Sequence, residues 1–388
     1  MPSESQIPTA SQDTSRRFAA RVALFYGTLF GMTGTHLPFF TVWLKAVGID
    51  AFWIGLITAV PPVSRFTVLP LVTGFAERRN ALRGAIIVTA FATALGFFVL
   101  GTQHWPVIVF MIYILTCCLW TPMVPLTDAY ALRGVRRYGL NYGPLRLWGS
   151  AAFIVGALVC GLLFDAIAAR NLIWIIAGSA AIGALASLAL QPLDDAGTAR
   201  PAAGDASTLL RDRGFIAIMV ASALIQGSHA AYYIFASIAW QQAGYDGLTI
   251  AVLWALGVVA EIVLFALSPR FSLQPSTLVV IAAASAAARW AIMAQDLPLP
   301  VLALVQLGHA LSFGLTQVGI MGLMLRHVPS HVMARGQGYL TACGGIVAAL
   351  ASIASGTIYG IWGQGIYYVM AAMAASGGLV IWLARARL

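Results

Sequence analysis

Ionisable side chains lie deep inside several long apolar stretches of this sequence. The charged ones are Arg65, Asp128, Arg146, Glu261 and Arg289, and the histidines are His36, His229 and His309. A charge at the centre of a bilayer costs at least about 2.5–3.5 kcal/mol on insertion scales, so such residues usually have a function. Arginine binds planar anions, whereas imidazoles and buried carboxylates exchange protons near neutral pH. These residue types therefore indicate anion binding and proton transfer.

Two pairs of opposite charge can form among these residues. Asp128 and Arg146 lie on consecutive apolar stretches at similar depth, and Glu261 and Arg289 lie on another consecutive pair. Arg65 is then left over, and a buried guanidinium without a partner binds a planar carboxylate through two parallel hydrogen bonds. We therefore predict a substrate site in which Arg65 and Arg146 bind an anionic group. Asp128 would be the partner of Arg146 and a hydrogen-bond acceptor for the substrate. The alternative is that Arg65 pairs with Asp128 or caps backbone carbonyl groups.

Polar residues also recur at helical spacing on two of the apolar stretches. The two sets are Gln306, His309, Phe313 and Gln317, and Gln226, His229, Tyr233 and Ser237. Residues spaced by three, four and four positions share one face of a helix. Such a face is unfavourable against lipid and should meet a water-filled cavity or another helix. The residues that we predict to line a cavity are His36, His229, Tyr233, Gln306 and Gln317.

Glu261, Arg289 and His309 form a candidate group for proton coupling. Burial disfavours the ionised form of a glutamate, and a nearby arginine favours it. Withdrawal of Arg289 from Glu261 would therefore promote protonation, and its approach would release the proton. The sequence alone does not bring the three residues together.

The composition defines the class of protein around these residues. The chain has 388 residues, of which 60% are hydrophobic and 9% are charged, whereas a soluble domain is about one quarter charged. This excludes a soluble enzyme, a disordered protein and a nucleic-acid binder. A membrane span needs about 20 apolar residues. Twelve such spans are predicted, near 18–44, 52–75, 83–102, 105–131, 143–165, 170–190, 213–240, 248–268, 274–294, 299–325, 332–358 and 364–385.

The cations are distributed unequally between the two sides of these spans. Seventeen arginines lie at the ends of the chain and in the even-numbered loops, whereas only Lys45 and Arg170 lie in the odd-numbered loops. Positive residues gather on the cytoplasmic side, so we predict a multi-pass protein of the inner (plasma) membrane with both termini in the cytoplasm. A polar stretch at 191–212, without an apolar run, predicts a cytoplasmic linker. The predicted organisation is a tail (1–16), a six-helix bundle (17–190), this linker and a second six-helix bundle (213–388).

Motifs of catalysis and cofactor binding are absent from the sequence. There is no phosphate-binding loop, no His-Glu-x-x-His zinc motif and no Gly-x-Ser-x-Gly elbow. The four cysteines, Cys117, Cys118, Cys160 and Cys343, all lie in apolar runs without metal-ligand spacing. We read them as packing residues. The prediction is a protein that is not an enzyme and has no metal and no cofactor.

Several segments resemble one branch of the major facilitator superfamily. They are 142–150 (YGPLRLWGS), 228–235 (SHAAYYIF), 253–258 (LWALGV) with Glu261, 289–290 (RW), and 306–310 (QLGHA) with 313–314 (FG). Together they resemble the 3-phenylpropionate transporter-like branch, which is related to oligosaccharide:proton symporters such as lactose permease. The resemblance covers nearly the whole chain. It implies an all-α membrane protein with twelve transmembrane helices in two six-helix bundles.

The resemblance also implies roles for the buried charges. Asp128 and Arg146 occupy places similar to the acid and the arginine that bind substrate in lactose permease, and Glu261, Arg289 and His309 resemble its binding and coupling residues. One turn after His309, where that permease has a second acid, this sequence has Ser312 and Phe313. A proton site identical to that of the permease is therefore not expected.

The prediction for function is a monomeric secondary transporter that takes up a small organic, aromatic acid such as 3-phenylpropionate with a proton. Its partners would be the substrate, the proton and the lipid bilayer, with no nucleic acid. Transport would proceed by alternating access. The alternatives are a sugar or nucleoside proton symporter and a drug or metabolite exporter. A membrane-embedded transferase, a passive channel and a receptor-like sensor are alternatives from other classes.

Overall fold

The computed structural model describes residues 12–193 and 207–388, and all regular structure in this part is helical. The first half contains α1 (Gln12–Ala46), α2 (Ala51–Thr58), α3 (Val60–Phe66), α4 (Val68–Arg78), α5 (Leu82–Gly101), α6 (Pro106–Trp120), α7 (Met123–Tyr138), α8 (Tyr142–Ala166) and α9 (Leu172–Ser187). The second half contains α10 (Arg213–Gly227), α11 (Ala230–Gln242), α12 (Gly247–Leu267), α13 (Pro275–Met293), α14 (Leu299–Leu307), α15 (Leu315–His327), α16 (Met333–Trp362) and α17 (Ile366–Ala384). Residues 1–11 of the predicted tail and 194–206 of the predicted linker lie outside the described residues, whereas residues 12–16 of the predicted tail already belong to α1.

Within the described residues, ten helical stretches are long and apolar enough to cross a membrane. One of them, Ser330–Arg387, contains both α16 and α17, which run in opposite directions after a turn at Gly363 (φ 55°). The first helix, α1, is a further span in addition to these ten stretches. It has 35 residues and is about 52 Å long. The predicted membrane protein of twelve helices is therefore confirmed.

Four of the twelve spans are interrupted helices. The second comprises α2, α3 and α4, the fourth α6 and α7, the seventh α10 and α11, and the tenth α14 and α15. Prolines account for two interruptions, because Pro61 and Pro62 open α3 and Pro122 precedes α7, and proline lacks the N–H that continues a helix. The tenth span instead contains a π-helical turn, Ala310–Gly314. None of these interruptions was expected from the sequence.

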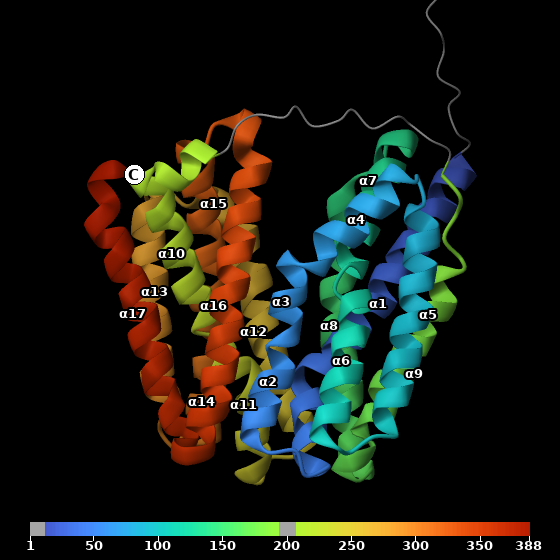
Figure 1. Cartoon of the computed structure of the whole chain (residues 1–388), viewed down its shortest axis with the longest axis horizontal. Helices are drawn as coiled ribbons and strands as arrows, with labels where there is room; N and C mark the ends of the chain where they lie inside the picture. The colour runs from blue at the N-terminus through green and yellow to red at the C-terminus, as the bar shows by residue number, and fades with distance from the viewer. Residues whose placement is uncertain (1–11, 194–206) are drawn as a thin grey trace, which may run out of the picture.

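The helices pack as two bundles side by side (Figure 1). In the first bundle α1 packs on α8 and α9, and α5 packs on α6 and α9. In the second, α10 packs on α16 and α17, and α13 packs on α15 and α17. The described beginning of α1 and the C-terminus both lie on the upper face of Figure 1.

The two bundles meet closely near the lower face of Figure 1, through two crossings of glycines. A Cβ atom added to Gly55 on α2 would lie 2.8 Å from the Cα atom of Gly356 on α16. A Cβ atom added to Gly161 on α8 would collide with the carbonyl oxygen of Gly247 on α12. Glycine permits this approach because it has no side chain.

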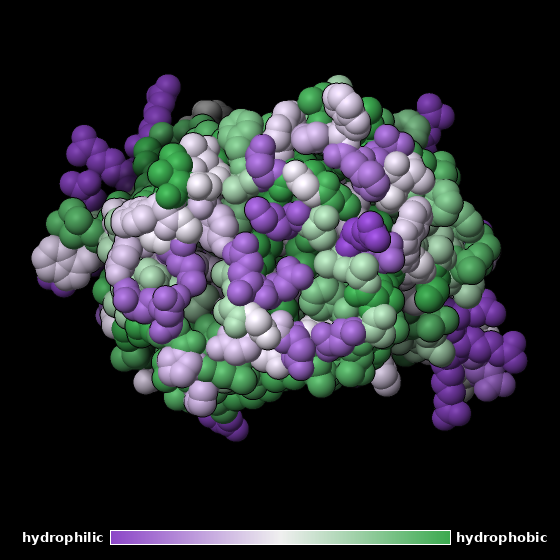
Figure 2. All heavy atoms as spheres, turned by 90° about the horizontal axis from the view of Figure 1, so that it is seen from below, coloured by the Kyte–Doolittle hydropathy of each residue, from purple (hydrophilic) through white to green (hydrophobic). Residues whose placement is uncertain are grey.

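A carboxylate reinforces the second crossing. Asp165 at the end of α8 accepts hydrogen bonds from the backbone N–H groups of Gly247 (2.6 Å) and Leu248 (3.3 Å) at the start of α12. These N–H groups have no partner inside their own helix. Figure 2 views this lower face, where hydrophilic side chains gather over the middle within a hydrophobic rim. The structure therefore holds the two bundles together at their lower ends.

Candidate functional site

The first polar cluster lies in the first bundle, around Asp128 of α7. Its Oδ1 atom accepts hydrogen bonds from the Tyr26 hydroxyl of α1 (2.6 Å) and the Tyr142 hydroxyl of α8 (2.9 Å). The Nε atom of Arg146 is 4.0 Å from the same oxygen. The side chains of Asp128 and Arg146 remain 32% and 33% exposed. The structure thus confirms that Asp128 and Arg146 lie together, as a loose ion pair.

Aromatic rings orient the guanidinium of Arg146. Its central carbon is 4.0 Å from the centroid of the Phe30 ring and 5.6 Å from that of Tyr26. Gly149 makes room for this stack, since a Cβ atom there would lie 2.8 Å from both Arg146 and Phe30. A guanidinium that lies flat on a ring keeps its N–H edges available for an anion.

Arg65 of α3 has an exposed side chain, although it lies within a membrane-spanning stretch. Within the described residues it makes no ion pair or hydrogen bond, and the alternative pairing with Asp128 is not formed because Asp128 is held by Tyr26 and Tyr142. Arg65 lies within electrostatic range of Tyr233 on α11, in the other bundle. Arg65 therefore faces the region between the bundles.

The second cluster is built around Arg289 of α13, which is 4% exposed. Its guanidinium donates to Oε1 of Gln306 (3.0 Å), to the carbonyl of Val305 (3.2 Å) and to Oγ of Ser312 (3.3 Å). The rings of Tyr232 and Trp290 lie 4.5 and 4.6 Å from its central carbon. Among the described residues, no carboxylate lies within ion-pair distance of this arginine.

The direct ion pair that Glu261 and Arg289 could form is not present, because His309 lies between them. Arg289 Nη1 is 3.2 Å from His309 Nδ1, and His309 Nε2 is 3.7 Å from Oε2 of Glu261. A guanidinium can only donate hydrogen bonds, so Nδ1 of His309 is the acceptor and its proton resides on Nε2. The N–H of a neutral imidazole therefore faces Glu261.

This second cluster is ordered along the helix axes. Arg289 lies four residues before the lower end of α13, or about 6 Å of helix rise. Glu261 lies six residues before the upper end of α12, or about 9 Å. The carboxylate is thus the member of the cluster closer to the upper face, and its side chain is 21% exposed.

Most of the predicted cavity lining is more deeply buried than expected. His229 and Gln306 are fully buried, and His229 Nε2 lies 3.2 Å from Ser312 Oγ, so both residues belong to the Arg289 cluster. His36 is 6% exposed and bonds the Tyr113 hydroxyl (3.1 Å) inside the first bundle. Neighbouring helices cover all three residues, and Nδ1 of His36 is left without a hydrogen-bond partner in the described part of the chain. The accessible members are Tyr233, which is half-buried, and Gln317, which is exposed.

The π-helical turn after His309 positions the second cluster. A π-helical turn adds one residue to a helix and often marks a functional site. Here it places Ser312 against both Arg289 and His229, and it brings Gly314 beside Glu261, where an added Cβ atom would lie 3.5 Å from the glutamate Cγ atom. A one-residue insertion of this kind leaves no mark in the helical spacing of the sequence.

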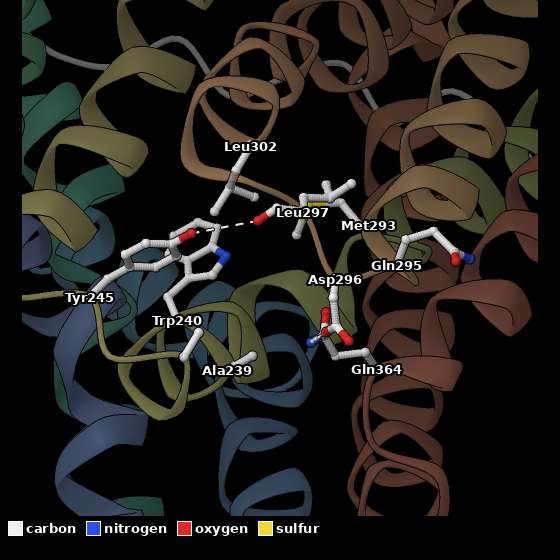
Figure 3. Close-up of a pocket in the computed structure, with 10 residues that line it drawn as sticks. Ala239, Trp240, Tyr245, Met293, Gln295, Asp296, Leu297, Leu302 and Gln364 are labelled. Carbon is white, nitrogen blue, oxygen red and sulfur yellow. Dashed lines mark hydrogen bonds between the residues drawn. The ribbon is translucent and has the colours of Figure 1, made fainter.

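A separate pocket of about 210 Å³ opens at the lower end of the second bundle (Figure 3). Trp240 and Tyr245 line one side of the pocket, and Asp296 lines it beside Gln364. Two further lining residues, Met293 and Leu302, contact the amide of Gln306 through the Met293 sulfur (3.7 Å) and the Leu302 carbonyl (3.1 Å). One layer of side chains therefore separates this pocket from the Arg289 cluster.

Sequence reasoning missed six side chains of the two clusters, which are Tyr26, Phe30, Tyr142, Tyr232, Trp290 and Ser312. Each lies in an apolar stretch or at its edge, where aromatic residues ordinarily pack or anchor a span. The position of Asp128 within an apolar stretch was a signal that polar partners must exist, but it did not identify them.

The paired bundles and the polar clusters between and within them define a multi-pass membrane transporter of the major facilitator type. Residues 19–370 match the profile of the MFS_1 like family, and the chain belongs to this family. It is therefore a transporter of small molecules and not an enzyme.

Curated relatives and solved structures agree with this assignment. The chain is 33% identical over 361 residues to a "probable 3-phenylpropionic acid transporter" of Escherichia coli (strain K12), covering 91% of this chain and 94% of the relative. It is 28% identical over 377 residues to a maltose permease of Geobacillus stearothermophilus, covering 94% and 93%. The crystal structure of the nucleoside transporter NupG superposes with a TM-score of 0.84 at 15% identity, covering 94% of this chain and 98% of that one. The last similarity concerns the fold alone.

Proposed function

We propose that this protein takes up a small aromatic carboxylate together with a proton. The observation that supports this most directly is Arg65, a guanidinium in the middle of a membrane span that has no anionic partner among the described residues. An unpaired arginine at this depth is costly unless an anion binds to it. Arg146, whose N–H edges are free above Phe30, is a second anchor for the same carboxylate.

The charges of the deep residues explain how the proton and the anion can be coupled. Three arginines and two carboxylates lie deep in the described spans, so their net charge is one positive unit when Glu261 is ionised. A proton on Glu261 raises the net charge to two positive units. The attraction for a carboxylate rises accordingly. Protonation of Glu261 therefore favours substrate binding, and substrate binding favours protonation.

His309 serves in this scheme as a neutral donor, and Glu261 carries the proton. While Arg289 donates to Nδ1 of His309, that nitrogen cannot accept a proton. The Nε2–H group of His309 instead faces Glu261 and can stabilise its ionised form. Glu261 also takes the place of the second acid that is absent at Ser312 and Phe313.

The aromatic part of the substrate would bind among rings of the second bundle. Tyr233 stacks on Trp254 with ring centroids 6.1 Å apart and lies near both Arg65 and Glu261. A carboxylate on Arg65 thus leaves the substrate ring within reach of Tyr233. The similarity to a relative described as a 3-phenylpropionic acid transporter supports the same substrate class.

Alternating access would operate about the lower contacts of the bundles. We propose that the lower face of Figure 1 is the external side, because it carries Lys45 and Arg170 whereas the upper face carries the arginine-rich loops. The described conformation would then be closed to the outside. The proposed location is the inner membrane, with cytoplasmic termini and a monomeric protein.

Uptake of labelled 3-phenylpropionate into proteoliposomes tests this proposal, with and without an imposed proton gradient. Wild-type protein and the exposed-loop control Arg170→Gln should accumulate substrate, and Arg65→Gln should not. Accumulation that survives in Arg65→Gln would remove Arg65 from the site but keep the substrate. No accumulation by wild-type protein would refute the substrate class and direct the search to sugars and nucleosides.

A further inference from the structure

Asp128 engages two phenols more closely than it engages its arginine. Tyr26 and Tyr142 donate to Oδ1 at 2.6 and 2.9 Å, whereas Arg146 Nε is 4.0 Å from the same atom. A charge-assisted hydrogen bond between guanidinium and carboxylate normally measures about 2.7–2.9 Å. The pair is therefore held apart, although both side chains are partly exposed.

The guanidinium of Arg146 remains free as a result. In the described part of the chain the guanidinium stacks on the Phe30 ring but makes no hydrogen bond. Tyr26 contributes to both sides of this arrangement, because its hydroxyl binds Asp128 while its ring lies 5.6 Å from Arg146. A bidentate pair with Asp128 would occupy the N–H edges that a substrate carboxylate needs.

We propose that Tyr26 and Tyr142 are positioning residues that hold Asp128 away from Arg146, so that the guanidinium stays available to the substrate carboxylate. The proposal rests on the proposed function in taking a carboxylate as the ligand. It gives Asp128 a different role from the one predicted: the aspartate balances the charge of the site and does not bind substrate.

Removal of both hydroxyl groups tests the proposal. In Tyr26→Phe/Tyr142→Phe, Asp128 should close onto Arg146 and compete with substrate, which raises KM for 3-phenylpropionate roughly tenfold while kcat changes little. Adding Asp128→Asn to the double variant removes the competing charge and should restore KM. Tyr339→Phe is the matched control, because Tyr339 packs on Phe215 and makes no hydrogen bond in the described chain.

A second readout is independent of the substrate. Phenylglyoxal modifies free guanidinium groups, and its reaction with Arg146 can be quantified by mass spectrometry of the labelled protein. Labelling of Arg146 should fall severalfold in Tyr26→Phe/Tyr142→Phe and return when Asp128→Asn is added. Since Tyr26 is fully buried, Tyr142→Phe alone, at a half-buried position, provides a variant with less risk to folding.

The outcomes separate this proposal from the proposed function. Unchanged KM and unchanged labelling in the double variant would overturn the positioning role. A loss of transport that Asp128→Asn does not reverse would also overturn it, because it would indicate a purely structural role. Absence of 3-phenylpropionate uptake by wild-type protein would refute the substrate, and the labelling of Arg146 would still decide the role of the tyrosines.

Discussion

At the scale of single residues, Glu261 is the group on which the proposed coupling depends. It is partly exposed, it faces the N–H of His309, and it is the nearest member of its cluster to the upper face. The other members are already committed to hydrogen bonds: Arg289 to Gln306 and Val305, and His309 to Arg289. Of Glu261, Arg289 and His309, the carboxylate is therefore the group that can accept an arriving proton.

We expect Glu261→Gln to lose proton-driven accumulation but to keep the exchange of substrate across the membrane. A glutamine mimics the protonated acid and can no longer release its proton, while the anion site remains intact. Uptake driven by a pH gradient should fall at least tenfold, and counterflow at equal pH should continue. Asp296→Asn, in an exposed loop, is the control. Normal accumulation by Glu261→Gln would exclude this residue as the proton carrier.

The buried ionisable residues were predictable from the sequence because a charge in an apolar stretch is conspicuous, but their partners were not. Arg289 was expected to meet Glu261 and instead meets His309, which lies between the two residues. Tyr26 was not considered at all. Tyrosines within apolar spans ordinarily serve packing, and only the three-dimensional contact with Asp128 reveals this one.

At the scale of helices, the glycine crossing between α8 and α12 should control closure of the lower face. Gly161→Val would place side-chain atoms against the Gly247 carbonyl, and overpacking of this kind costs about 1–3 kcal/mol. The closed population should fall roughly fivefold or more. Spin labels at Ala168→Cys and Ala243→Cys, on exposed sites of the two bundles, should then report a longer distance.

Gly178→Val provides a comparison for that experiment, because a Cβ atom at this glycine meets nothing within 4 Å. The distance between the two spin labels in Gly178→Val should equal the distance in the labelled protein that keeps both glycines. An unchanged distance in Gly161→Val as well would show that the crossing does not limit opening.

The start of α10 carries a charge interaction that should depend on pH. Asp212 caps the helix by accepting from the Phe215 N–H (2.8 Å) and is 2.8 Å from His327 Nε2. The hydrogen bond from His327 and then that from Phe215 lower the pKa of Asp212. The stabilisation that comes from a lowered carboxyl pKa is fully present above the unfolded pKa of about 3.9. It is lost as the pH falls through the folded pKa.

Asp212→Asn keeps a helix cap but removes the charge. Because the Asp212 side chain is 46% exposed, we expect the melting temperature of the Asp212→Asn protein at pH 7 to be lower than that of wild type by no more than about 2 °C. The difference from wild type should shrink as the pH falls below the unfolded carboxyl pKa of about 3.9 and through the lower folded pKa. A difference that stays constant over this range would show that the charge is not its cause.

At the scale of the whole molecule, the sequence was sufficient to predict the helices and their number. Each span needs about 20 apolar residues, and polar, charged or glycine residues mark the breaks between the spans. The interruptions within spans were not predictable to the same degree. Ser228 and His229 break the seventh span without a proline, so only the packing of α10 and α11 against their neighbours explains where that helix divides.

The unequal distribution of arginines predicts one orientation of the protein in the cell membrane, which cysteine labelling of whole cells can measure. In a background with Cys117, Cys118, Cys160 and Cys343 replaced by serine, Ala168→Cys on the lower face should react with a membrane-impermeant maleimide added outside. Ser272→Cys in the opposite loop should react only after the cells are opened. Labelling of Ser272→Cys in intact cells would reverse the proposed orientation.

The single positive charge in excess among the deep residues has a consequence for the energetics of a complete cycle. When Glu261 is ionised and no substrate is bound, the five deep side chains carry one positive unit. When a proton and one carboxylate are both bound, the total is again one positive unit. The filled and the empty carrier would therefore respond identically to the membrane voltage, and net cargo would move without electric current. Accumulation would follow the pH difference across the membrane and would survive collapse of the voltage.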